Sequence, residues 1–161
     1  MSTNDASDKF IVFTLAGTQY GLRSRDVQHV EMVEAVTPVP NAAPFVEGIV
    51  FSRGAVVPVI NLRVRFGFER APLDLRTRLL VVGDETRRIG LLVDSAREFM
   101  TIPAAAIQPP HEAITALSGR YLEGVATLGQ RIVLVLKLDD VLAFAPDAIE
   151  DQAPPAAENR Q

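Results

Sequence analysis

The sequence contains an internal repeat, in which two stretches 76 residues apart share one pattern. Residues 45–49 read Phe-Val-Glu-Gly-Ile, and residues 121–125 read Tyr-Leu-Glu-Gly-Val. With the same offset, the apolar run 56–60 falls on the apolar run 132–136. Self-similarity at a fixed spacing indicates a duplicated structural unit. The chain is therefore expected to consist of two copies of one small fold.

An earlier segment repeats with a slightly different offset. Residues 20–22 (Tyr-Gly-Leu) align with residues 89–91 (Ile-Gly-Leu) at an offset of 69. The proline-rich stretch 103–110 can absorb the difference, because lengthening a surface loop costs little stability. Spacing alone leaves a second interpretation open, in which two apolar hairpins resemble each other by chance. The shared aromatic-x-Glu-Gly opening favours duplication.

Each half reads as short β-strands separated by turn residues, because apolar and β-branched runs end at glycine-containing turns. Pro58 lies inside one run and predicts an edge position or a bulge for that strand. A short helix is expected to close each half, at 61–66 and at 138–144. The expected strands are 10–15, 19–22, 30–36, 48–51, 55–60, 78–82, 88–93, 99–102, 121–128 and 131–136.

About five short strands in each half favour a small barrel, because closure removes the exposed edges of a sheet. Two such barrels packed together would leave a groove between them. The folded part is expected to span residues 9–144. Disordered tails are expected at 1–8, which is polar, and at 145–161, which is rich in alanine, proline and acidic residues.

Charge and composition argue against several function classes. The net charge of −4, from 16 basic and 20 acidic residues, argues against a nucleic-acid binder, which usually needs a basic face. The absence of cysteine excludes disulfides, thiolate nucleophiles and Cys-ligated metals. The polar start and the lack of a long apolar stretch predict a soluble, cytoplasmic protein without a secretory signal or membrane span.

No combination of residues predicts catalysis. His29 and His111 lack a second histidine at metal-binding spacing, and we expect both to be solvated at the surface. The two aspartates at 139–140 cannot share a helix face, and the acidic pair at 84–85 is typical of a turn. We therefore expect no enzyme activity, no metal and no cofactor.

A binding role is favoured instead for Arg53. It stands beside Gly54 in a tight turn between two apolar strands. Such a turn would present the guanidinium rigidly to a carboxylate or carbonyl of a partner, and arginine is enriched among the dominant contacts of interfaces. The alternative is that Arg53 is solvated in the turn and contacts no partner. Arg63 and Arg65 follow the same hairpin, and a surface role is equally open for them.

The run 48–63 resembles the signature hairpin of CheW domains, with an Arg-Gly-x-x-x-Pro core. The opening hairpin, 10–22, is similar to the first hairpin of that family. Residues 121–124 and 128–129 resemble its later one. The resemblance covers nearly all of residues 9–144.

The resemblance implies an all-β fold of two tandem SH3-like five-stranded β-barrels from an internal duplication, with short helices closing each half. The first barrel would cover about 10–66, completed by chain exchange at the ends, and the second about 78–144. The implied function is a non-enzymatic adaptor that couples methyl-accepting chemoreceptors to the histidine kinase CheA in chemotaxis.

The resemblance also implies partners and a location. The partners would be the regulatory domain of CheA, the cytoplasmic tip of the chemoreceptors, and other CheW-like domains in rings. The protein would act in the cytoplasm, at membrane-associated receptor arrays. Neither nucleic acid nor direct insertion into the membrane is implied.

Single positions can be carried over from the family. Arg53 matches the signature turn arginine, which is associated with receptor contact. Val27 and Gly48 lie at positions similar to family residues near the receptor groove. Leu128 and Gly129, on the second barrel, are the candidates for kinase contact.

Two departures from the family pattern bear on recognition. The family often has Asn-Leu before Arg-Gly, where this chain has Phe51 and Ser52, and often has Asp where this chain has Asn61. These changes put in doubt which receptor is recognised. Alternative functions are a coupling protein of a chemosensory-like pathway controlling pili-based motility or development, a relative of the kinase itself, and a hydrolase on a small barrel.

Overall fold

The computed structural model describes residues 7–84, 86–111 and 121–143. They form a mostly β fold of two curled sheets with short helices, which confirms the expected fold class. The elements are β1 (Ser7–Leu15), β2 (Thr18–Arg23), η2 (Ser24–Asp26), β3 (Val27–Met32), β4 (Val46–Ser52), β5 (Ala55–Asn61), α1 (Leu62–Arg65), β6 (Arg78–Asp84), β7 (Arg87–Val93), β8 (Ser95–Pro103), η3 (Ala104–Ala106), β9 (Ile107–Gln108), β10 (Leu122–Leu128), β11 (Arg131–Leu136) and α3 (Leu138–Val141).

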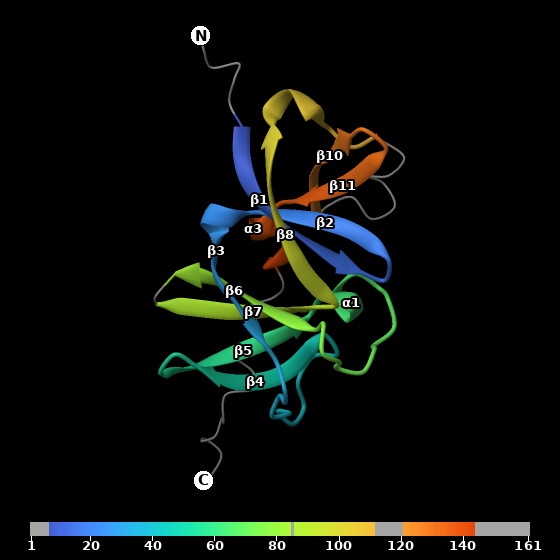
Figure 1. The fold of residues 1–161 in the computed structure, drawn as a ribbon. Helices are drawn as coiled ribbons and strands as arrows, with labels where there is room; N and C mark the ends of the chain where they lie inside the picture. The colour runs from blue at the N-terminus through green and yellow to red at the C-terminus, as the bar shows by residue number, and fades with distance from the viewer. Residues whose placement is uncertain (1–6, 85, 112–120, 144–161) are drawn as a thin grey trace.

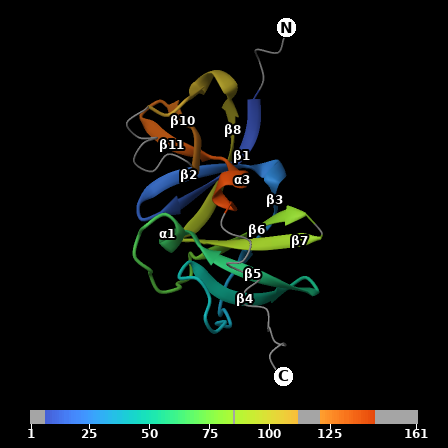
Figure 2. The same ribbon diagram turned by 180° about the vertical axis from the view of Figure 1, so that it is seen from behind.

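The strands are divided between a six-stranded sheet A, in the order β8-β1-β2-β11-β10-β9, and a five-stranded sheet B, in the order β3-β6-β7-β5-β4. Figure 1 shows sheet A above sheet B, with α1 and α3 near their junction, and Figure 2 gives the reverse view. Sheet A closes because β8 and β9, at its two edges, belong to one segment of chain. Sheet B closes through backbone hydrogen bonds between Thr37, which follows β3, and Ile49 of β4 (2.9 and 2.8 Å).

The two barrels exchange strands between the repeats. Sheet A takes β1 and β2 from the first repeat and β8 to β11 from the second, whereas sheet B combines β3 to β5 with β6 and β7. The ranges 10–66 and 78–144 therefore describe the repeats and not the barrels.

The register of the strands shows the same duplication. In sheet A, β2 and β11 run parallel with Gly21 opposite Val135. In sheet B, β7 and β5 run parallel with Gly90 opposite Val59. The offsets of 69 and 76 found in the sequence convert the first pair into the second. The internal repeat is thus a repeat of structure.

The apolar core has three parts, namely the two barrel interiors and a layer that joins the barrels. Alternate side chains of a strand point to opposite faces, so β1 serves two of these parts. Phe10 and Val12 fill the interior of sheet A, whereas Ile11 and Phe13 pack in the joining layer. In β6, Leu79 and Val81 lie inside sheet B, and Leu80 and Val82 lie in the joining layer.

Some local expectations change. Pro58 does not place β5 at an edge, because β5 lies between β4 and β7. The ladder with β7 begins only at Val59, so the residue without an N–H stands just before it. Ser7 and Asp8, expected in the first tail, belong to β1. Residues 1–6, the tail 145–161 and residue 144 of the expected second helix lie outside the described residues.

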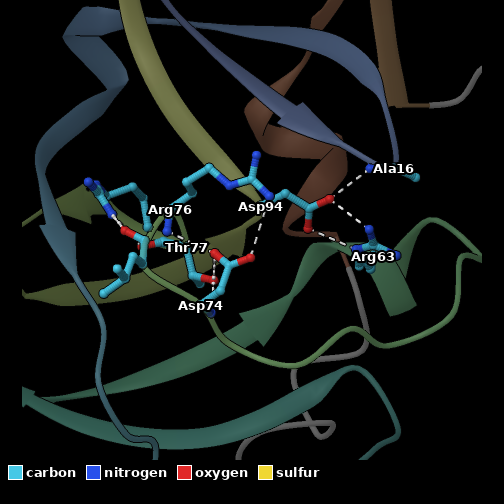
Figure 3. Close-up of polar contacts among 8 residues, drawn as sticks. Ala16, Arg63, Asp74, Arg76, Thr77 and Asp94 are labelled. Atoms are coloured by element: carbon cyan, nitrogen blue, oxygen red, sulfur yellow. Dashed lines mark hydrogen bonds and ion pairs between the residues drawn. The ribbon is translucent and has the colours of Figure 1, made fainter.

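Asp94 connects the barrels at the crossover from β7 to β8. Its carboxylate accepts two hydrogen bonds from the guanidinium of Arg63 in α1 (both 2.8 Å) and one from the backbone N–H of Ala16 in the β1–β2 turn (2.9 Å; Figure 3). Burial raises the pKa of Asp94, and the charge of Asp74 acts in the same direction. The hydrogen bonds and the charge of Arg63 outweigh both, so the pKa of Asp94 lies below its usual value.

Arg65 makes a second connection. Its guanidinium lies over the rings of Phe45 and Tyr121, at 5.2 and 5.1 Å from their centres, and its Nε donates a hydrogen bond to the carbonyl of Val141 in α3 (3.1 Å). Phe45 and Tyr121 are equivalent positions of the two repeats. Arg63 and Arg65 therefore serve the junction of the barrels rather than an open surface.

We expect Asp94 to make the stability of the protein sensitive to acid. A carboxylate whose pKa is lowered on folding stabilises the fold above its unfolded pKa of about 3.8, and this contribution is lost as the pH falls towards the folded pKa. Asp94→Asn should lower the free energy of unfolding near pH 7 by about 1–3 kcal/mol. Urea unfolding curves should also depend less on pH in the acid range. Asp139→Asn, which removes an exposed carboxylate, is the control, and an Asp94→Asn variant that behaves like it would contradict this assignment.

Candidate functional site

A groove of about 430 Å³ lies at the junction of the barrels, between β3 of sheet B and β8 of sheet A. Both strands pass this junction in Figure 1. They occupy equivalent places in the two repeats, since residues 27 and 96 are related by the offset of 69 and both line the groove. Its apolar walls come from Ile11, Val27, Val30, Ala96 and Phe99, and its polar side chains from Ser24, Gln28, His29, Arg97 and Glu98.

Arg53 stands at the tip of the β4–β5 hairpin. The φ angles of Arg53 and Gly54 are 49° and 83°, as in a type I′ turn. The left-handed conformation costs an ordinary L-residue about 1–2 kcal/mol, and Ala16 also adopts it in the β1–β2 turn (φ 50°), so it belongs to the geometry of these tight turns. Phe51 and Val56 are opposite each other across this hairpin and are 75% and 61% exposed. The hairpin thus offers a cation together with an apolar surface.

A polar cluster of His29, Glu31 and Ser52 connects the groove to this turn. The hydroxyl of the buried Ser52 donates a hydrogen bond to Glu31, and Nε2 of His29 lies 2.5 Å from the same carboxylate oxygen. Burial raises the pKa of Glu31. Hydrogen bonds from Ser52 and His29, and the charges of His29 and Arg53, outweigh it, so the pKa lies below its usual value. His29 lines the groove and Ser52 precedes Arg53, so the cluster joins the two features.

The cluster does not have the geometry of a hydrolase triad. In a triad the imidazole stands between the serine and the acid and uses one nitrogen for each. Here the hydroxyl of Ser52 points to Glu31 directly, and His29 approaches both partners with Nε2. The side chain of His29 is only 11% exposed, so the expectation of a solvated histidine is wrong for this residue. The cluster anchors two strands to each other.

Val27 and Gly48, both expected near the receptor groove, occupy different places. Val27 begins β3 and lines the groove. Gly48 lies at a bulge of β4 with φ of 148°, and a Cβ on it would come within 2.0 Å of the carbonyl oxygen of Thr37. Gly48 therefore belongs to the closure of sheet B, whereas Arg53 directly follows Ser52 of the polar cluster.

Leu128 and Gly129 lie at the β10–β11 hairpin of sheet A. Leu128 is half-buried against the interior of that barrel, and Gly129 has φ of 64° in the turn. Ile132, three residues further on, is 57% exposed. By the offset of 76, Gly129 is the counterpart of Arg53 and Ile132 the counterpart of Val56. The kinase and receptor candidates thus occupy equivalent hairpins on different barrels.

The other polar candidates have structural contacts. Asp84 accepts hydrogen bonds from the backbone N–H groups of Thr86 and Arg87 (2.9 Å each), as expected of a turn residue. Asp140 lies 3.9 Å from Lys137 in an ion pair. Glu85 lies outside the described residues. Within residues 7–84, 86–111 and 121–143, no group of three or more His, Asp or Glu side chains is placed to hold a metal ion.

Sequence reasoning missed Glu31, Ser52 and Phe99. The serine was visible as a departure from the family pattern, but its partner is 21 residues away along the chain and meets it only when sheet B closes. Phe99 reads as an ordinary strand residue, and only its 69% exposure beside the groove distinguishes it.

The chain is similar to chemotaxis proteins over most of its length. The family described as CheW-like domain matches residues 9–145. Chemotaxis protein CheW of Klebsiella aerogenes is 30% identical over 89% of this chain and 86% of that protein. Protein FrzA of Myxococcus xanthus is 30% identical over 85% and 86%. The crystal structure of scaffolding protein TtCheW from Thermoanaerobacter tengcongensis is 31% identical, with a TM-score of 0.77, and the match covers 86% of this chain and 90% of that one.

We expect Gly48→Ala to destabilise the fold. The added methyl group would collide with the backbone of Thr37 at the closure of sheet B, and the free energy of unfolding should fall by about 3 kcal/mol. Gly17→Ala is the control, because Gly17 also has a positive φ, of 83°, but open space around it; it should cost about 1 kcal/mol. Thermal unfolding of both variants checks this, and equal midpoints would show that Gly48 has no structural role.

Proposed function

The chain belongs to the family of CheW-like domains, and from this membership we propose how it couples chemoreceptors to a histidine kinase. As a member it is a chemotaxis coupling adaptor. In our proposal the cytoplasmic tip of a methyl-accepting chemoreceptor binds in the groove between β3 and β8, and the regulatory domain of CheA binds the β10–β11 hairpin. Other CheW-like domains are proposed as further partners in rings.

The observation that carries the receptor proposal is the strained, exposed arginine turn joined to an apolar groove. The groove can bury apolar side chains of one receptor helix, and Val27 and Phe99 provide apolar walls for them. A helix bound in a groove needs a few apolar anchors and a few polar contacts. Arg53 is suited to make such a contact at the rim, through hydrogen bonds to a carboxylate or to the last carbonyls of the helix.

The kinase proposal rests on the equivalent hairpin of the other barrel. Leu128 and Gly129 are at its turn, and the exposed Ile132 adds an apolar contact beside them. An adaptor needs two separate surfaces, because it must hold both partners at once. Weak contacts on each surface are sufficient in an array, where many linked sites raise the overall affinity.

We further propose that the chain performs no catalysis itself and that residues 9–144 form the folded domain, with the match over 9–145 in support of this range. The protein would be held at membrane-associated receptor arrays by its partners. No helix within the described ranges is long and apolar enough to cross a bilayer. The net charge of −4 also favours protein partners over nucleic acid.

A second candidate function is coupling in a chemosensory-like pathway that controls pili-based motility or development. The similarity to Protein FrzA, a relative whose name differs from that of the CheW proteins, supports this second candidate function. The two functions use the same two surfaces and differ in the pathway that the kinase serves. Deletion of the gene separates them, since loss of chemotactic spreading supports the first and loss of pili-based movement supports the second.

The proposal is tested by binding of the purified full chain to purified CheA and to a receptor signalling fragment. We expect binding to each partner alone and a three-component complex when both are present, because Leu128, Gly129 and Ile132 do not line the groove. Failure to bind either partner would refute the coupling role, and competition between the partners would refute the assignment of separate surfaces.

Arg53→Ala should lower the affinity for the receptor fragment by about 1–3 kcal/mol, the usual range for a dominant interface residue. The side chain is exposed, so the unfolding temperature should stay nearly the same. Arg87→Ala removes an exposed arginine beside the neighbouring turn of sheet B and is the matched control. Titration calorimetry checks both variants, and an unchanged receptor affinity for Arg53→Ala would reject the role of this residue.

Ile132→Ser should weaken binding of CheA by about threefold or more, because an exposed apolar contact is lost. Binding of the receptor fragment should not change, since Ile132 does not line the groove. Leu75→Ser alters an 85% exposed leucine in the connection before β6 and serves as the control. Equal kinase affinity of the two variants would remove the β10–β11 hairpin from the kinase surface.

A further inference from the structure

We propose that Glu31 and Ser52 are positioning residues for receptor recognition, because they fasten the Arg53 turn to the wall of the groove. This inference rests on the receptor role proposed above and names the residues that regulate the same site. Neither residue needs to touch the receptor. Their effect is on where the guanidinium of Arg53 stands and how freely the turn moves.

The hydrogen bond between Ser52 and Glu31 joins the two edge strands of sheet B. β3 and β4 are the two edges of sheet B. The backbone bonds between Thr37 and Ile49 close the barrel at one level. The contact of Ser52 with Glu31 closes it again at the end of β4, immediately before the turn. Without this contact, the tip of the β4–β5 hairpin would extend beyond the Thr37–Ile49 bonds. It would then be held only by the pairing of β4 with β5.

The order of the Arg53 turn in the unbound protein affects the free-energy cost of binding a partner. Arg53 is held in a left-handed conformation, with φ of 49°. A turn that must be ordered when a partner binds loses affinity through the entropy of ordering. The side chain of Ser52 is buried, and its hydroxyl is fixed by a carboxylate that His29 also contacts. The residue before Arg53 is therefore already ordered in the unbound protein.

Glu31 and Arg53 also interact electrostatically. Glu31 carries a negative charge that acts on Arg53, since the positive charge of Arg53 contributes to the low pKa of the Glu31 carboxyl. Glu31 belongs to β3, the strand whose first residues line the groove. The charge of Glu31 therefore attracts the guanidinium of Arg53 towards β3. A neutral residue at position 31 would remove this attraction.

The hydrogen bond between Ser52 and Glu31 bears on specificity. Ser52 is 4% exposed, and its hydroxyl donates to the Glu31 carboxylate. A buried hydroxyl without a partner is costly, so Ser52 and Glu31 depend on each other in this chain. The pair sets a particular orientation of the Arg53 turn. It is thus suited to a receptor tip whose acidic or carbonyl group stands in that place.

The test is a double-mutant cycle with the purified full chain and the receptor signalling fragment. Glu31→Gln keeps the shape of the side chain and removes its charge, and it should weaken receptor binding by about threefold to tenfold. In the Arg53→Ala background the same change should have almost no effect, because the residue that it positions is gone. Glu34→Gln removes an exposed carboxylate three residues further along and should not change binding in either background.

Binding of CheA is the second readout, because it uses the other barrel. A merely structural role of Glu31 would weaken binding of both partners and would persist in the Arg53→Ala background; either result would overturn the proposal. If Glu31→Gln folds poorly, Ser52→Ala replaces it in the test. This variant removes only the hydroxyl and is expected to show the same loss of receptor affinity. Wild-type protein that binds the receptor with no effect of Glu31→Gln or Ser52→Ala would refute this inference alone. Failure of the wild-type protein to bind the receptor fragment would refute the proposed function as well.

Discussion

Burial of β1 and β6 on both faces is the constraint on which the rest of the structure depends. Each strand gives alternate side chains to the interior of its own barrel and to the layer between the barrels. Phe10 and Phe13, on opposite faces of β1, are 0% and 1% exposed, and complete burial of such a side chain contributes about 1.5–3 kcal/mol. The two barrels are therefore one cooperative core. Their relative position is fixed, which a binding site at their junction requires.

Polar contacts complete this junction where the apolar layer ends. Asp94 binds Arg63 of one barrel and the Ala16 turn of the other, and Arg65 fits between the equivalent rings of the two repeats. On the face where β3 and β8 pass each other, a groove remains. The groove is thus a consequence of the duplication, because it lies between the same strand of both repeats.

The fold could be predicted from the sequence in large part, because its signals are local. Ala16-Gly17 and Arg53-Gly54 mark hairpins through residues with positive φ, and the runs beside them are apolar. The exchange of hairpins follows only from the family resemblance and not from the residues themselves, since the pairing of Gly21 with Val135 joins residues far apart along the chain. Arg53 could be found because it belongs to a recognisable run. Glu31 could not, because its contact with Ser52 exists only after the barrel has closed.

The exchange of hairpins has a consequence for the integrity of the molecule. The connection between α1 and β6 lies at the surface and links the two repeats, but each sheet contains strands of both. A single proteolytic cut in this connection would not release two independent halves. The two fragments would stay associated, because separating them would require the strand pairing of both sheets to open. Damage that divides an ordinary two-domain protein would leave this adaptor assembled.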